Sequence, residues 1–105
     1  TEMWFVKSLA STPGIRSVLA LHETVCAGAC DGYARMRRRP ALCLLHMGPG
    51  LANALSNLHN AKRSRSPVIT LVGDMATWHL ASDAPLCMDI DSEKLIPLLL
   101  TERLS

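Results

Sequence analysis

The sequence predicts an α/β domain in which strands and helices alternate around a parallel sheet. Three short apolar runs have the continuous hydrophobicity of strands that are buried on both faces: residues 18–21, 41–45 and 67–72. The segments between these runs carry apolar residues at helical spacing. Strands that alternate with helices favour crossover connections, so we expect a three-layer α/β/α arrangement with a doubly wound parallel sheet.

The N-terminal half begins with a short helix over residues 3–10 that stops at Ser11-Thr12-Pro13-Gly14. It stops there because proline lacks an amide donor and glycine has free backbone torsions. The apolar run at 18–21 is the first predicted strand. A helix over 23–36 follows, rich in alanine and cysteine, whose small side chains allow close packing on the sheet.

The second half repeats the pattern. Pro40 precedes a strand over 41–45, where a missing amide donor does least harm. Gly48-Pro49-Gly50 is predicted to form a tight turn into a helix over 51–63, and a third strand covers 67–72.

The C-terminal third is less regular. Residues 75–90 read as an excursion over the surface, and 91–104 are predicted to form a last helix with Asp91 or Ser92 as its N-cap. A chain of 105 residues without repeats or linkers corresponds to one small domain, residues 1–105.

Charge and composition exclude several classes of function. The net charge of +2 is small, and the basic cluster at 35–39 lacks interleaved aromatic residues, so it reads as a solvated helix end and not as a nucleic-acid surface. No apolar run approaches the ~18 residues of a membrane span, and no signal peptide is visible. Nucleic acid and membrane are therefore not expected partners.

The cysteines read as core positions and not as a disulfide framework, which favours a reducing compartment, either cytoplasm or an organelle matrix. His22, Cys26 and Cys30 would share one helical face if His22 is helical, with Cys43 as the nearest fourth zinc ligand. Structural zinc sites more often use short Cys-x-x-Cys knuckles. Buried small side chains are therefore favoured over zinc, and no metal site is predicted.

Glu23 is the leading candidate for chemistry, because it follows an apolar run at the sheet edge where α/β proteins bind ligands. With alanine and cysteine beyond it, we expect a poorly solvated carboxyl whose pKa is raised by burial. Such a group can share a proton with a ring nitrogen. The alternative is an ordinary acidic residue that interacts with the dipole of the helix first turn.

An ordered set of motifs surrounds this residue: Glu23, then Asp31-Gly32-Tyr33-Ala34-Arg35, then Gly48-Pro49-Gly50 with Asn53. The set resembles the pyrimidine-binding domain of thiamine-diphosphate enzymes, near acetolactate synthase and benzoylformate decarboxylase. No single tripeptide is specific, but the order and spacing are. The resemblance covers about residues 1–90, and residues 91–105 diverge from it.

The resemblance implies a role for each site residue. Glu23 would hydrogen-bond N1′ of the aminopyrimidine and favour its imino form, while Gly48, Pro49, Gly50 and Asn53 would shape the ring pocket. Asn53 has an alternative role in ordering the turn.

His46 would face the substrate as a proton-transfer group. Leu45-His46 matches the benzoylformate decarboxylases, whereas the Gly-Pro-Gly motif resembles the synthases. The alternative for His46 is a strand-end histidine that bonds to backbone.

The Asp31–Arg35 motif is expected to be structural. Gly32 would permit close packing, Tyr33 would bury its ring, and Arg35 would pair with a carboxylate or cap helix carbonyls. Family members usually carry glycine in a helix-ending turn at the position of Arg38, and a left-handed residue there would cost about 1 kcal/mol or more.

The family pattern is incomplete in this sequence. The diphosphate and Mg2+ signature of the family is Gly-Asp-Gly followed by Asn-Asn, whereas this chain has Gly73-Asp74-Met75 and no Asn-Asn. The resemblance therefore places the diphosphate and Mg2+ on a second subunit or domain that is absent from this chain. The central strand that begins the family domain is also not seen, so we expect a partial pyrimidine-binding domain.

The resemblance implies the ring-binding half of an acetolactate synthase-like enzyme with thiamine diphosphate as cofactor. The parent would be a homo-oligomer acting on small 2-oxo acids, with carboligation favoured over decarboxylation and no turnover by this chain alone. The alternative is a non-catalytic interaction module, or a truncated remnant, that pairs with a full-length homologue. A nucleotide-binding module is disfavoured because Gly-x-Gly-x-x-Gly is missing.

Overall fold

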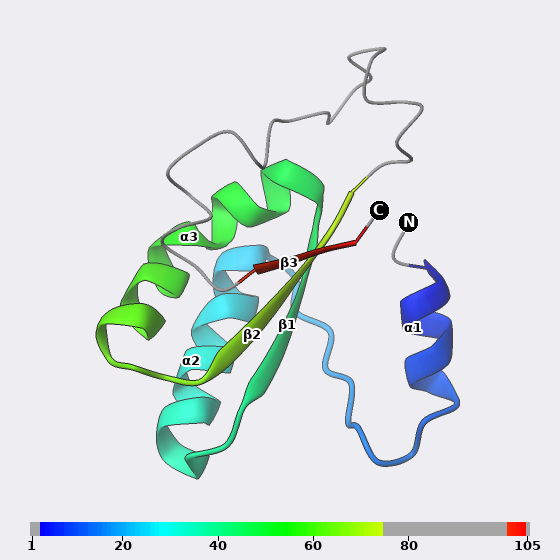
Figure 1. The fold of residues 1–105 in the computed structure, drawn as a ribbon, viewed down its shortest axis with the longest axis horizontal. Helices are drawn as coiled ribbons and strands as arrows, with labels where there is room; N and C mark the ends of the chain where they lie inside the picture. The colour runs from blue at the N-terminus through cyan, green and yellow to red at the C-terminus, as the bar shows by residue number, and fades with distance from the viewer. Residues whose placement is uncertain (1–2, 75–100, 105) are drawn as a thin grey trace.

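The computed structural model describes residues 3–74 and 101–104 (Figure 1). Three strands form one parallel sheet in the order β1-β2-β3, which confirms the α/β class with a parallel sheet. In β1 and β2, Ala41 lies opposite Val68 and His46 lies opposite Gly73. The bounds of the helices and strands are α1 Met3–Ala10, α2 Glu23–Arg37, β1 Ala41–His46, α3 Met47–Arg63, β2 Val68–Gly73 and β3 Thr101–Leu104.

Helices α2 and α3 pack against each other and against the sheet (Figure 1). The burial of β1 alternates, with Ala41, Cys43 and Leu45 buried and Leu42 exposed on the opposite face. The hydrophobic core therefore lies between the helix pair and one face of the sheet. Its largest fully buried side chains are Leu45, Leu51, Val72 and Cys43.

The run at 18–21, predicted as a strand, is irregular in the structure, so this prediction is wrong. Val18, Leu19 and Leu21 are exposed, and Leu21 retains 96% of its accessible surface. A strand is stable only when a neighbour accepts its backbone hydrogen bonds. Within residues 3–74 and 101–104 no strand pairs with this segment, so apolar character alone does not make it extended.

The Gly48-Pro49-Gly50 motif forms the first turn of α3 and not a separate tight turn, which corrects the prediction. Helix α3 begins at Met47, directly after β1, and Met47 adopts a positive φ of 57° that redirects the chain. Pro49 is tolerated there because the first amides of a helix have no acceptor within it. Gly-Pro-Gly is typical of a turn, but here β1 passes directly into α3 at this motif.

The predicted helix over 91–104 is wrong for residues 101–104, which form β3 and pair with β2 from Thr70 onward. Pairing with an open strand edge overrides the weak helical periodicity of these residues. The rest of that helix and the predicted excursion at 75–90 lie outside the described residues.

Helix α2 tests four structural predictions. Arg38 ends the helix with φ 53° and ψ 39°, which confirms the expected left-handed residue, and Arg35 pairs with Asp31 as proposed. Tyr33 is exposed, so its ring is not buried. Gly32 has no neighbour where a Cβ would lie, so it does not serve close packing; Gly28 does.

No helix among the described residues is both long and apolar enough to cross a bilayer.

Candidate site at the start of helices α2 and α3

The predicted site residues come from three adjoining segments. Glu23 is the first residue of α2, His46 is the last of β1, and Gly50 and Asn53 lie in the first two turns of α3. Because α3 begins directly after His46, the start of α3 lies at the carboxyl end of β1. The structure thus brings the start of α2 to the sheet edge where α/β folds bind ligands.

Local hydrogen bonds fix the start of α2. His22 is extended and serves as the N-cap, and its Nδ1 accepts a hydrogen bond from the amide of Thr24 at 3.2 Å. The Thr24 hydroxyl donates to the carbonyl of Asn53 at 2.7 Å. These two bonds hold the residues on both sides of Glu23, one of them directly to α3.

The carboxylate of Glu23 lies against α3. Asn53 Nδ2 donates a hydrogen bond to Glu23 Oε2 at 3.2 Å. A Cβ on residue 50 would lie 3.5 Å from Glu23 Cγ and 3.6 Å from Oε1, so Gly50 lets the helix backbone contact this side chain. The side chain of Glu23 keeps 31% of its surface exposed, which leaves it open to a further donor.

The expected rise in the pKa of Glu23 is wrong, because the structure lowers that pKa below its ordinary 4.5. A hydrogen bond from its own backbone amide is the largest cause, followed by the bond from Asn53. His22 and His46 add smaller electrostatic contributions, and together these outweigh the effect of burial. Glu23 is therefore a carboxylate at neutral pH in the free chain.

The remaining predicted residues adjoin this carboxylate. His46 is exposed, and it lies close enough to contribute electrostatically to the lowered pKa of Glu23. Gly48 is buried and Pro49 half-buried, both in the first turn of α3. The structure thus gathers Glu23, His46, Gly50 and Asn53 at one point, with Gly48 and Pro49 in the same turn.

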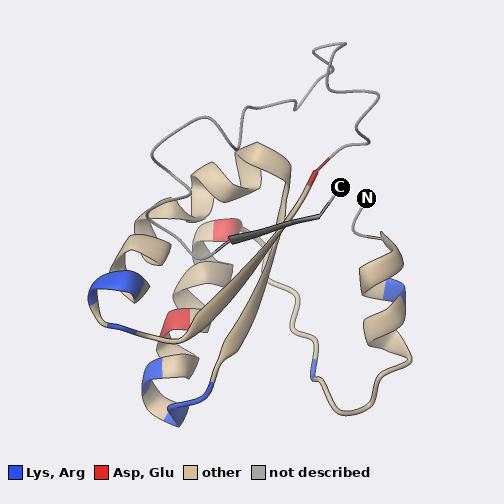
Figure 2. Ribbon diagram, in the orientation of Figure 1, with Lys and Arg blue, Asp and Glu red and all other residues tan. Residues whose placement is uncertain are grey.

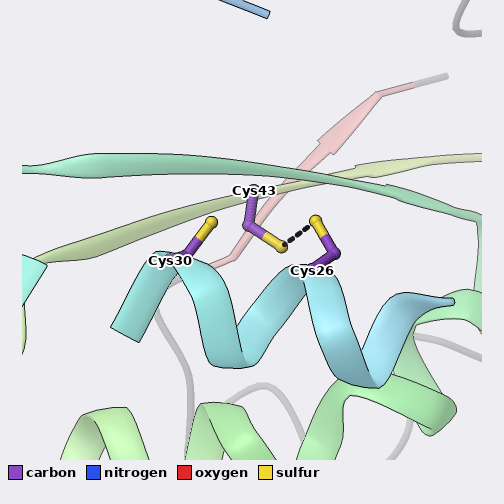
Figure 3. Close-up of side chains that lie close together, drawn as sticks. All are labelled: Cys26, Cys30 and Cys43. Atoms are coloured by element: carbon purple, nitrogen blue, oxygen red, sulfur yellow. Dashed lines mark hydrogen bonds between the residues drawn. The ribbon is translucent and has the colours of Figure 1, made fainter. Parts of the chain in front are cut away.

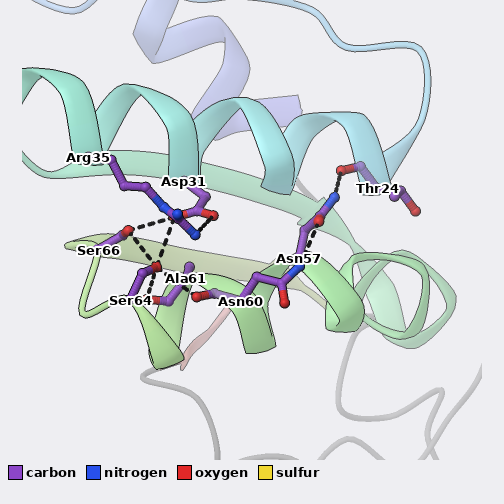
Figure 4. A network of polar contacts seen from close by, with 8 residues as sticks. All are labelled: Thr24, Asp31, Arg35, Asn57, Asn60, Ala61, Ser64 and Ser66. Atoms are coloured by element: carbon purple, nitrogen blue, oxygen red, sulfur yellow. Dashed lines mark hydrogen bonds and ion pairs between the residues drawn. The ribbon is translucent and has the colours of Figure 1, made fainter.

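Two supporting residues were missed by sequence reasoning, Thr24 and Asn57. Asn57 Nδ2 donates to the carbonyl of Thr24 at 2.7 Å (Figure 4). This bond lies one turn along α3 from the Thr24–Asn53 bond. These pairs are 29 and 33 residues apart in sequence, so no local spacing could have indicated them.

Positive charge lies elsewhere in the fold. The lysine and arginine residues of α2 and α3 lie in the last turns of these helices, whereas Glu23 is the first residue of α2 (Figure 2). Residues 22–24 and 46–53 include no lysine or arginine. The site is built around a carboxylate with histidine and amide neighbours, a donor set that suits a nitrogen heterocycle better than a phosphate group.

Residues 1–93 match the protein family described as "Thiamine pyrophosphate enzyme, N-terminal TPP binding domain". The chain belongs to this family. The resemblance drawn from the sequence motifs is therefore confirmed.

Relatives of this thiamine pyrophosphate enzyme domain include a Mycobacterium tuberculosis protein named "Putative acetolactate synthase large subunit IlvX". It is 55% identical over 92 residues, which cover 88% of this chain and 18% of the relative. The chloroplastic acetolactate synthase of Arabidopsis thaliana is 32% identical over 78 residues, or 74% of this chain and 12% of that protein.

The crystal structure of benzoylformate decarboxylase from Polynucleobacter necessarius superimposes with a TM-score of 0.73 at 29% identity. The match covers 81% of this chain and 16% of that structure. The chain therefore spans less than a fifth of the length of each of these proteins.

Proposed function

We propose that this chain binds the aminopyrimidine half of thiamine diphosphate, with Glu23 as the hydrogen-bonding partner of N1′. The observation that carries the proposal is the environment of the Glu23 carboxylate. It accepts a hydrogen bond from Asn53, contacts Gly50 and remains partly exposed to solvent. Membership of the thiamine pyrophosphate enzyme family supplies the cofactor class.

The residues present fit the ring of this cofactor. A carboxylate held on one oxygen by Asn53 retains acceptor capacity for an external ring nitrogen. Gly48, Pro49 and Gly50 place no long side chain over the first turn of α3, so a flat ring can approach the backbone there. The site segments lack lysine and arginine, so we assign the diphosphate and Mg2+ to a second subunit or domain.

Each residue of this site would have a distinct role toward the bound cofactor. Glu23 holds a proton between its carboxyl group and N1′, and Asn53 fixes the orientation of Oε2. His46 faces the substrate as a proton-transfer group. The bound cofactor supplies the nucleophilic carbon on which 2-oxo acid chemistry depends.

The parent activity that we propose is carboligation of small 2-oxo acids in an acetolactate synthase-like homo-oligomer, in the cytoplasm or an organelle matrix. Acetolactate synthases among the relatives support carboligation, and His46 after Leu45 keeps decarboxylation as the second possibility. Because this chain would hold only the ring half of the cofactor, we expect no turnover by it alone.

The test is an NMR titration of the full chain and of Glu23→Gln with thiamine, which carries the ring but no diphosphate. We expect Glu23→Gln to weaken thiamine binding roughly tenfold or more, because a hydrogen bond to a charged group contributes about 1.5–3 kcal/mol. An analogue with carbon in place of N1′ is the matched control, and it should bind both proteins equally weakly.

Two outcomes would overturn the assignment. One is a folded wild-type chain that shows no resonance shifts around residues 22–24 and 46–53 at millimolar thiamine. The other is equal thiamine affinity of Glu23→Gln and the wild type. Circular dichroism on each variant checks that the fold is retained.

A second candidate function is an interaction module that pairs with a full-length homologue. The observation in its favour is the number of large apolar side chains left exposed, which include Trp4, Leu19, Leu21, Leu42 and Ile69. Co-expression with a full-length acetolactate synthase should then yield a mixed oligomer with reduced specific activity. Separate elution of the two chains with full enzyme activity would exclude this candidate.

A further inference from the structure

Three cysteine thiols meet between α2 and β1 (Figure 3). Cys26 and Cys30 lie one turn apart on the face of α2 that packs on the sheet, and Cys43 points from β1 toward them. Their sulfur atoms all lie within 4.8 Å of one another, and the Cys26 and Cys43 sulfurs are 3.5 Å apart. All three are free thiols.

These separations match the spacing of thiolates around a metal ion. With a metal–sulfur bond of about 2.3 Å, two sulfurs lie about 3.8 Å apart in a tetrahedral site and about 4.0 Å apart in a trigonal one. The Cys26–Cys43 distance of 3.5 Å is slightly below these values and no pair of the three sulfurs is more than 4.8 Å apart, so small rotations about the side-chain bonds would bring all three to a common ion.

We propose that Cys26, Cys30 and Cys43 form a binding site for a thiophilic d10 cation, Cu+ or Zn2+. Soft thiolate donors select such ions over Mg2+ or Ca2+, which prefer oxygen ligands. Among the described residues no fourth histidine, cysteine or carboxylate joins the group. Cu+ is satisfied by three thiolates, and Zn2+ would add a water molecule as its fourth ligand.

The three cysteines differ in their exposure to solvent. Cys43 is fully buried, whereas Cys26 and Cys30 are half-buried on the helix. An ion could therefore enter past α2 and reach a donor that solvent does not touch. His22, the remaining ligand of the zinc set considered from the sequence, lies outside the helix as its N-cap and is not part of the group.

The three thiols are close enough to interact with one another. Hydrogen bonds from Cys30 and then from Cys43 lower the pKa of the Cys26 thiol. The same interaction with Cys26 raises the pKa of Cys30 and of Cys43. The thiolate is the ligating form of cysteine, so binding of the ion releases thiol protons to solvent.

The experiment measures 1:1 uptake of Zn2+ and of Cu+ by the reduced full chain under anaerobic conditions, by competition with a chromophoric chelator. The absorption of Co2+ in place of Zn2+ reports thiolate ligation directly. We expect Cys26→Ser and Cys30→Ser each to weaken binding by roughly 100-fold, because each removes one of three ligands. These two half-buried positions tolerate serine more readily than Cys43, and circular dichroism checks their fold.

Cys87→Ser is the matched control, because Cys87 is the cysteine outside the described residues. Its variant should bind within about threefold of the wild type, a difference of less than about 0.7 kcal/mol. An equal loss in Cys87→Ser would mean that uptake does not depend specifically on Cys26, Cys30 and Cys43, and it would count against the proposal.

The proposal is overturned if the reduced wild type takes up no ion, or if Cys26→Ser and Cys30→Ser bind as tightly as the wild type. Preferential retention of Cu+ over Zn2+ would identify the three-coordinate form of the site, and the reverse would identify the four-coordinate form with water. Neither result depends on thiamine binding, so this test and that of the proposed function can fail separately.

Discussion

Arg38 is one of three non-glycine residues with a positive φ in the part of the chain that the structure describes. It ends α2 in the left-handed region, where its amide donates to the carbonyl of Ala34 at 2.9 Å. A non-glycine residue pays about 1–2 kcal/mol for this conformation, and glycine recovers part of that cost after its extra freedom in the unfolded chain is counted. We expect Arg38→Gly to raise the free energy of unfolding by about 0.5–1 kcal/mol in urea denaturation.

The neighbouring Arg39 provides the control for charge. Arg39→Gly removes the same charge from the same exposed end of α2, but Arg39 does not have a positive φ. Its free energy of unfolding should be unchanged or slightly lower. An equal gain in both variants would mean that relief of charge repulsion, and not backbone strain, stabilises the protein.

At the residue scale the sequence indicated which residues meet at the candidate site but not the electrostatics of Glu23. The position of Glu23 after an apolar run, and the motifs around it, indicated the correct family and the correct neighbours, Gly50 and Asn53. The direction of its pKa shift was wrong because the carboxylate is bonded by its own amide and by Asn53. Those bonds depend on how α2 and α3 pack, which no local spacing encodes.

At the scale of helices and strands, two glycines of α2 probe how closely this helix packs against α3. A Cβ on Gly28 would lie 3.0 Å from Asn57 Nδ2, which is held by its bond to the Thr24 carbonyl. A Cβ on Gly32 would meet nothing within 4 Å. The same substitution in the same helix therefore has different consequences for packing.

We expect Gly32→Ala to raise the free energy of unfolding by up to about 1 kcal/mol, the usual advantage of alanine over glycine in a helix. Gly28→Ala should gain clearly less, because Asn57 Nδ2 must shift and weaken a hydrogen bond that contributes about 1 kcal/mol, which offsets the advantage of alanine. Thermal unfolding of both variants checks this. If both gain equally, α2 and α3 are not in the close contact that positions Thr24 beside Asn53.

Elements were predictable from sequence where local pattern and tertiary pairing agree. The helices at 3–10 and 23–37 and the strands at 41–46 and 68–73 combine correct periodicity with clear start and stop signals. The run at 18–21 has strand character but no described strand beside it, and residues 101–104 have a partner, β2, that their sequence does not indicate. Pairing between distant segments decided both cases.

At the scale of the whole molecule, one buried carboxylate joins α2 to the connection between α3 and β2 (Figure 4). Asp31 keeps 11% of its side-chain surface and accepts two hydrogen bonds from Arg35, at 2.8 and 2.9 Å. The hydroxyls of Ser66 and Ser64 also donate to it. The network therefore links residues 35 positions apart in the sequence.

These donors lower the pKa of Asp31 below its ordinary 3.8, with Arg35 as the largest cause. A carboxyl whose pKa is lower in the folded state stabilises the fold at every pH above the unfolded value, and the contribution is lost as pH falls through the folded value. The stabilisation is therefore complete at neutral pH and declines only below about pH 3.8.

We expect Asp31→Asn to lower the free energy of unfolding by about 1.5–3 kcal/mol at neutral pH, since it weakens bonds made to a buried charge. Urea unfolding at a series of pH values should show this difference shrinking as the pH falls toward about 3. Arg35→Gln is the matched control: it removes the exposed cation but leaves both serine hydroxyls, so its cost should be smaller. A deficit in Asp31→Asn that stays constant with pH would show that shape, and not charge, is what Asp31 contributes to joining the two helices.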